Sequence, residues 1–147
     1  ASWTADFSVS GGIIMYKGVP MTWWTRKQKS VSSSSAQAEY FAAALASREG
    51  VYFIDLLDDV GLPATCPVPL LLDSKSAVDL AFDPVAFKKT KHILRAAHEL
   101  RDRVARDIYH PTYVQAAGQL ADLLTKGLGP TAHTTQLARI LAERPGK

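Results

Sequence analysis

Three carboxylates stand at positions that core packing does not explain. Asp73 directly follows the apolar run 68–72, at the strand end where functional crevices form in open α/β sheets. Glu39 lies one turn into a long helical segment, on the side of its apolar neighbours, and Asp122 lies within the segment 119–124. Carboxylates from separate elements that meet at one end of a sheet are the ligands that Mg²⁺ prefers. A pair of such ions can activate a water and stabilise the leaving oxygen of a phosphodiester.

Each of the three carboxylates also has an ordinary structural explanation. Asp73 could be the N-cap of the helix that follows it, and Glu39 could be a first-turn acid that the helix dipole favours. Asp122 could be a surface residue. The spacing of the three in the sequence leaves open whether they converge.

The charge of the chain is unevenly distributed. The 147 residues include 17 Lys and Arg against 14 Asp and Glu, which gives a net charge of +3. Seven of the basic residues lie at positions 88–106 against two acidic ones, and the run 26–29 adds three more. Two basic patches on an otherwise acidic chain suit a polyanionic partner such as nucleic acid. The alternative is a basic helix whose charged face is simply solvated.

Length and composition exclude several classes of protein. With 47% hydrophobic and 21% charged residues the chain matches a globular protein rather than a disordered one. Its length predicts a single domain over residues 1–147. No apolar run approaches the roughly 20 residues of a membrane helix, and no signal-peptide pattern opens the sequence, so we expect neither secretion nor a membrane partner. The lone Cys66 cannot form an internal disulfide, which fits a reducing compartment.

The hydrophobic pattern predicts the elements that must position the carboxylates. Strands are expected at 1–4 (the end of an incomplete first strand), 11–16, 21–25, 67–72 and 108–114. Helices are expected at 36–60, 74–82, 91–106, 116–128 and 134–143, with Gly50 as a candidate kink in the first. Pro111 indicates an edge position for the last strand. This order predicts an α/β fold in which three antiparallel strands precede parallel crossovers, giving a mixed sheet flanked by helices.

Five ordered sequence blocks carry a resemblance to a known family. They are RKQKSV with SSAQAEY in 26–40, LDSKSA at 72–77, DPV at 83–85, KTKHI at 89–93, and YV with QLADLLTK in 113–126. In this order the blocks resemble those of the ribonuclease H domain of copia-type retrotransposons, the C-terminal part of the reverse transcriptase region of a Pol polyprotein. The resemblance covers nearly the whole chain.

The resemblance implies a fold and an activity. The fold is ribonuclease H-like, with a mixed five-stranded sheet flanked by helices. The activity is endonucleolytic hydrolysis of the RNA strand of RNA–DNA hybrids during reverse transcription, with four acidic residues holding two Mg²⁺ ions, for which Mn²⁺ could substitute. By motif, Glu39 is the second of these catalytic and metal-binding residues, Asp73 the third and Asp122 the fourth.

The first of the four acidic residues is absent from the sequence. In the family it stands on the first strand, and here the matching block opens with Ala1, so we expect a domain truncated just inside that strand. Asp6 maps to the loop that follows and is not expected to replace it. The alternative function is therefore a catalytically impaired ribonuclease H-like fragment, acting as a nucleic-acid-binding clamp or remaining as a relic of a decayed retroelement.

Basic and polar residues near the carboxylates are the predicted nucleic-acid contacts. Cationic side chains would track the phosphates of a hybrid, and hydroxyl and amide groups would read 2′-hydroxyls. The set is Arg26, Lys27, Lys29, Ser35, Ser74, Lys89, Lys91, His92 and Gln119. We expect a structural or phosphate-side role for His92 and a structural role for His110. The resemblance further implies the reverse transcriptase and integrase regions of the same polyprotein as partners, in a cytoplasmic retroelement particle or in the nucleus.

Overall fold

The computed structural model describes residues 9–28, 35–82 and 91–142. In chain order the elements are β1 (Val9–Tyr16), β2 (Val19–Lys27), α1 (Ser35–Asp59), β3 (Val68–Leu72), α2 (Lys75–Phe82), α3 (Lys91–Ala105), β4 (Tyr109–Tyr113), the 3₁₀ helices η1 (Ala116–Gly118) and η2 (Leu120–Leu124), and α4 (Pro130–Ala142). They fall into two compact units, which we call the three-helix unit (33–115) and the hairpin unit (1–32 with 116–147). None of the described helices has the length and apolar content needed to cross a bilayer.

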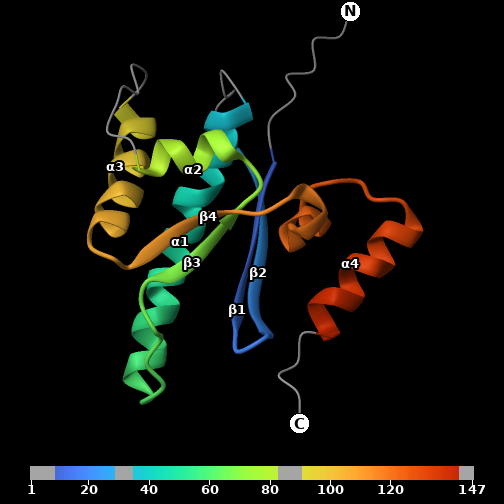
Figure 1. The fold of residues 1–147 in the computed structure, drawn as a ribbon, viewed down its shortest axis with the longest axis horizontal. Coiled ribbons are helices and arrows are strands. Elements are labelled where there is room, and N and C mark those ends of the chain that lie inside the picture. Colours follow the sequence, from blue (N-terminus) through green and yellow to red (C-terminus); the bar gives the residue numbers. More distant parts are fainter. Residues whose placement is uncertain (1–8, 29–34, 83–90, 143–147) are drawn as a thin grey trace, which may run out of the picture. The chain divides into compact units, whose positions relative to one another are not determined.

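The hairpin unit is built on the antiparallel pair of β1 and β2 (Figure 1). Lys17 and Gly18 connect the strands, and both have positive φ, 48° and 75°. Two central residues with positive φ are what a type I′ turn requires, and its twist matches that of the flanking strands. The turn lies between the two strands that the sequence predicts at 11–16 and 21–25.

The C-terminal part of the hairpin unit packs on this pair of strands. A Cβ placed on Gly11 would lie 2.6 Å from Thr125 Cγ2, so only glycine allows so close an approach of the segment after η2. The Thr25 hydroxyl, opposite Gly11, donates a hydrogen bond to the Leu124 carbonyl at 3.0 Å. Helix α4 contacts both η2 and β2.

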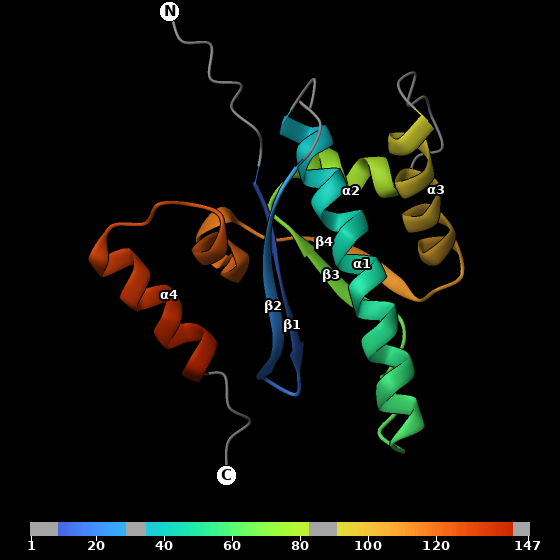
Figure 2. The same ribbon diagram turned by 180° about the vertical axis from the view of Figure 1, so that it is seen from behind.

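The three-helix unit contains a second pair of strands. β3 and β4 are parallel, in a register that runs from Val68 opposite Tyr109 to Leu72 opposite Tyr113. Helix α1 lies behind this pair in Figure 1 and in front of it in Figure 2, so it covers one face of the pair. The helices α2 and α3 contact α1, each other and β4.

One hydrophobic core holds the three-helix unit together. Its members are aliphatic and aromatic side chains from all five elements of the unit: Tyr40, Ala43, Ala44, Leu70, Leu72, Ala77, Ala81, Ala97, Leu100 and Tyr109. Five of them are alanines, which let helices approach closely. Gly50 serves the same purpose, because a Cβ there would lie 2.3 Å from the Tyr109 hydroxyl. Helix α1 runs through Gly50, so this glycine makes room for the tyrosine.

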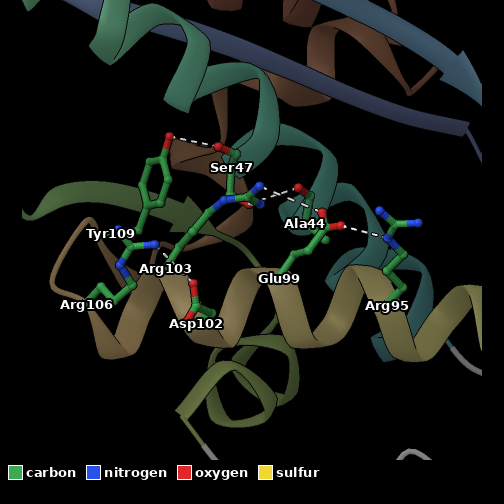
Figure 3. A network of polar contacts seen from close by, with 8 residues as sticks. All are labelled: Ala44, Ser47, Arg95, Glu99, Asp102, Arg103, Arg106 and Tyr109. Atoms are coloured by element: carbon green, nitrogen blue, oxygen red, sulfur yellow. Dashed lines mark hydrogen bonds and ion pairs between the residues drawn. The ribbon is translucent and has the colours of Figure 1, made fainter.

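A polar network crosses the same core (Figure 3). Ser47 is fully buried, and its hydroxyl donates to the Ala44 carbonyl at 2.9 Å and accepts from Arg103 Nη1 at 3.0 Å. The Tyr109 hydroxyl donates to the Ser47 carbonyl at 2.9 Å. Arg103 Nη2 also pairs with Glu99 at 3.7 Å. The network thus fixes α1, α3 and β4 to one another.

Two predicted helices differ from the structure. The segment 116–128 contains two short 3₁₀ helices instead of one α-helix. Gly118 ends the first, and Gln119 separates them and caps the second, its side chain accepting from the Ala121 amide at 3.5 Å. The last helix begins at Pro130, not at Thr134, because proline suits the first helical position, where no amide donor is needed.

The mixed α/β class is confirmed, with antiparallel strands followed by parallel ones. The described strands form two two-stranded sheets, and the single five-stranded sheet is not shown. The strand expected at 1–4 and Asp6 lie outside the described residues. The prediction of one domain over 1–147 stays a prediction.

Candidate active site

Asp73 lies directly after β3 and is partly buried. Helix α2 follows it, but the residue that caps this helix is Ser74. The Ala77 amide donates to the Ser74 hydroxyl at 3.2 Å, and the Ala77 and Val78 amides both donate to the Ser74 carbonyl at 3.1 Å. Capping is the ordinary explanation for an acid at this position, and the structure assigns that task to Ser74. Capping of α2 therefore does not account for the acid at the strand end.

Glu39 lies near the N-terminus of α1 and is partly buried. The next residue anchors this part of the helix, since the Tyr40 ring is 2% exposed and its hydroxyl donates to the Ala97 carbonyl of α3 at 2.9 Å. Burial raises the pKa of Tyr40 to about 12, against the opposing effect of the nearby Arg101 charge. Tyr40 therefore remains a neutral donor at physiological pH. Glu39 and Asp73 both belong to the three-helix unit, in which α1 contacts β3.

Asp122 belongs to the hairpin unit, in the middle of η2. Its side chain is only 14% exposed, and its Oδ2 atom lies 2.7 Å from the ammonium of Lys126, whose side chain is 52% exposed. The Lys126 amide donates to the Asp122 carbonyl at 2.9 Å, which turns the chain so that both side chains project together. Asp122 is thus a largely buried carboxylate that forms an ion pair with Lys126, not a surface residue.

The nine residues predicted to contact nucleic acid fall into three groups in the structure. Arg26 and Lys27 are exposed at the end of β2, as phosphate contacts must be. Ser74 and Gln119 are described as caps of α2 and η2. The other five contacts carry no described side chain: Lys29 and Lys89 lie outside the described residues, and Ser35, Lys91 and His92 are placed only as first residues of α1 and α3. None of these nine contacts is tested.

Several basic residues of α3, and the basic residue after it, make contacts within the protein. Arg103 enters the Ser47 network, and Arg101 Nε donates to the Leu80 carbonyl at 3.3 Å. Arg106 pairs with Asp102 within the helix at 3.4 Å. His110 makes an edge-to-face contact with Phe82, ring centroids 5.7 Å apart, in keeping with the structural role predicted for it.

The donor chemistry of the three carboxylates fits a hard divalent cation. Glutamate and aspartate oxygens are its preferred ligands, and Asp122 already attracts a positive charge. Within the described part of the chain, no three His, Cys, Asp or Glu side chains gather closely enough to hold a metal ion.

Sequence reasoning missed Lys126 as the ion-pair partner of Asp122. The signal was available, because Lys126 stands four residues after Asp122 within the QLADLLTK block. An acid and a lysine at this spacing are neighbours along one side of a helical turn.

Comparison with known proteins gives the wider context. The chain is 34% identical over 144 residues to the retrovirus-related Pol polyprotein from transposon RE1 of Arabidopsis thaliana. The matched stretch covers 95% of the chain. It is 35% identical over 130 residues to that from transposon RE2 of the same plant, covering 88% of the chain, and 30% identical over 119 residues to that from transposon TNT 1-94 of Nicotiana tabacum, covering 81%.

The chain is homologous to part of these Pol polyproteins. It spans 10%, 9% and 9% of their respective lengths, so it corresponds to one small region of each. No protein family profile and no solved structure matches it. The chain thus belongs to the family of retrovirus-related Pol polyproteins from plant transposons.

Proposed function

We propose that this chain is a ribonuclease H-like domain of copia type, whose activity is Mg²⁺-dependent endonucleolytic cleavage of the RNA strand in RNA–DNA hybrids. The observation that carries the proposal is the position of Asp73. It stands directly after a strand, and the residue that caps the following helix is Ser74, so helix capping does not account for the acid at this position. Homology to Pol polyproteins over most of the chain supports the same assignment.

The proposal assigns a role to each acidic residue. Asp73 would be a metal ligand on the side of the attacking water and Glu39 one on the side of the leaving oxygen, and the sequence motif assigns a metal-binding role to Asp122 as well. Bound Mg²⁺ supplies an activated water and neutralises the leaving 3′-oxygen. The protein's own contribution is to hold the carboxylates on anchored elements, as the Tyr40 hydrogen bond does for the start of α1.

Arg26 and Lys27 would hold the hybrid by its phosphates. Such contacts depend on charge and not on base sequence, so binding should weaken steeply as salt is added. A ribonuclease H-like fold with a mixed five-stranded sheet is part of this proposal. So are the reverse transcriptase and integrase regions as neighbours in one polyprotein, and a retroelement particle or the nucleus as the place of action.

The test uses a chain extended at its N-terminus by about ten residues, enough for one strand. A labelled RNA–DNA hybrid is incubated with this chain with and without Mg²⁺. We expect cleavage of the RNA strand only with Mg²⁺, giving 5′-phosphate and 3′-hydroxyl ends. Asp73→Asn should abolish cleavage while leaving hybrid binding largely intact, because it removes a metal ligand and no phosphate contact.

The matched control is Asp79→Asn, which changes an exposed aspartate on α2, six residues further along the chain. It should cleave like the unchanged protein. Unchanged cleavage by Asp73→Asn would remove Asp73 from the site. Hybrid binding without any Mg²⁺-dependent cleavage in the extended chain would favour the non-catalytic clamp instead.

A further inference from the structure

The C-terminal part of α1 carries a row of large apolar side chains in solvent. Tyr52, Leu56 and Val60 follow one another at intervals of four residues, which places them along one side of the helix. The Val60 amide still donates to the Leu56 carbonyl at 3.2 Å, so the helical turn continues to the last of them. All three are exposed, Tyr52 by 69% and Val60 by 62%. In both ribbon views this end of α1 extends past α3 (Figure 1 and Figure 2). We call the three side chains the α1 stripe.

Three exposed aspartates stand beside the α1 stripe. Asp55 and Asp59 are four residues apart on the helix, a spacing at which like charges repel. Asp58 and Asp59 also lie at the C-terminus of α1, where the helix dipole favours cations. The last turns of α3 and α4 contain Arg103 and Arg139, whereas that of α1 contains no basic residue. Among the described residues, no ion pair reaches any of the three aspartates. They therefore lower the stability of the free helix.

The charge beside the α1 stripe determines which class of partner suits it. Three carboxylates without a described counter-ion repel the phosphates of nucleic acid and of anionic lipids, so neither polyanion fits this surface. Lysine or arginine side chains would remove both the mutual repulsion of the aspartates and their conflict with the helix dipole. An apolar row at helical spacing packs well against the apolar side of another helix. The row is about 12 Å long, which matches about two turns of such a helix.

We propose that the α1 stripe is a docking surface for an amphipathic helix of a protein partner. The apolar side of that helix covers the stripe, and its lysines or arginines pair with the three aspartates. The burial of apolar surface supplies most of the affinity, and the charges supply specificity for a basic helix over an acidic one. The inference is independent of the proposed nuclease activity, because it involves none of the three candidate metal ligands.

The test uses a synthetic helix of leucine and lysine as the probe. The peptide is about 18 residues long, enough for a helix to form on binding, and carries its leucines on one side. It is titrated into the isotope-labelled 147-residue chain, and the amide shifts of residues 51–62 are followed. We expect saturable shifts at these amides. A peptide with glutamate in place of lysine is the matched control, and it should cause none, because its charges repel the aspartates.

Two double variants separate the apolar contribution from the charged one. Tyr52→Ser with Leu56→Ser should weaken binding of the leucine–lysine peptide by about tenfold or more. Asp55→Asn with Asp59→Asn should weaken it by about two- to fivefold, and this difference should disappear as salt is added. The same asparagine variant should unfold at a higher urea concentration than the unchanged chain, because the repulsion along α1 is relieved. A purely structural role for the aspartates predicts the opposite shift.

The control variants change exposed residues of the same types elsewhere. Leu141→Ser lies on α4 and Asp79→Asn on α2, and both should bind the peptide like the unchanged chain. Absence of shifts at residues 51–62, or equal shifts with both peptides, would overturn the proposal. So would unchanged affinity in the serine variant, which would place the peptide elsewhere. Shifts at these amides that depend on protein concentration, without any peptide, would show that a second copy of the chain occupies the surface instead. If the serine variant does not fold, Tyr52→Ser alone takes its place.

Discussion

The two units of the chain are stabilised in different ways. In the three-helix unit ten buried hydrophobic side chains form one core, while in the hairpin unit Ile140 is the one buried hydrophobic residue among those described. The hairpin unit instead leaves large side chains in solvent, with Trp23 62% and Leu141 54% exposed. Its order depends on strand pairing and on a few hydrogen bonds, so its local stability should be lower.

The three candidate carboxylates are distributed over these two units. Glu39 and Asp73 lie in the well-packed unit, and Asp122 lies in the weakly packed one. A metal-binding side chain on a rigid element is already in position, so little conformational entropy is lost when the metal or substrate binds. A side chain on a loosely packed element must be ordered at that moment, which lowers the affinity. We therefore expect the segment of Asp122, which pairs with Lys126, to be ordered less firmly than the segments of Glu39 and Asp73.

Core truncation gives the largest expected effect. Leu100→Ala removes a fully buried side chain of the three-helix unit and should lower its free energy of unfolding by about 2–5 kcal/mol. Ile140→Ala should cost about 2 kcal/mol, at the lower end of the same range, since few buried side chains surround it and the structure can relax around the gap. Urea unfolding measures both values, and amide exchange assigns each loss to a unit. Equal losses of protection across the whole chain in both variants would contradict the distinction between the units.

Alkaline pH should weaken the three-helix unit in particular. Burial raises the pKa of Tyr109 to about 12, with Arg103 acting in the opposite direction, and burial likewise raises the pKa of Tyr40 to about 12. The folded state holds each phenolic proton more tightly than the unfolded state does, whose pKa is near 10.0. The stabilisation is therefore complete below about pH 10 and is lost as the pH rises towards 12.

The loss amounts to at most about 3 kcal/mol for each tyrosine. Unfolding in urea at several pH values between 9 and 12 measures it. The matched control is the double variant Tyr40→Phe and Tyr109→Phe, which should be less stable at pH 9 but should lose less stability on going to pH 12. A slope that is the same in both proteins would show that other groups cause the alkaline loss.

Much of the three-helix unit could be predicted from the sequence. The helices expected at 36–60 and 91–106 are observed at Ser35–Asp59 and Lys91–Ala105. Their apolar residues recur at helical spacing, and Gly61, with φ of 75°, together with Pro63 ends the first helix. Local signals and tertiary packing agree in this region, which is why the pattern was sufficient.

The hairpin unit was harder to predict after residue 115. The segment 116–128 has helical spacing of its apolar residues, but Gly118 and the Gln119 cap interrupt it, and 3₁₀ geometry results. The role of Gly50 was also out of reach, since it depends on Tyr109, a residue 59 positions away in the sequence. Likewise Arg103 counts as part of a basic patch in the sequence but donates to Ser47 in the structure.

The last pair of variants removes one hydrogen bond from each unit, and the loss in the hairpin unit gives the smallest expected change in the free energy of unfolding. Ser47→Ala removes the oxygen that accepts from Arg103, in a fully buried position, and should cost about 1–3 kcal/mol because the guanidinium loses a partner away from water. Thr25→Val removes the exposed bond to the Leu124 carbonyl and should cost about 0.5–1 kcal/mol, because water can replace it. Thr25→Ser keeps the hydroxyl and serves as the control for lost packing. Amide exchange should show the Thr25→Val effect at residues 120–126, next to Asp122, and the Ser47→Ala effect throughout the three-helix unit. A larger cost for Thr25→Val than for Ser47→Ala would mean that the segment carrying Asp122 is held more firmly than its packing indicates.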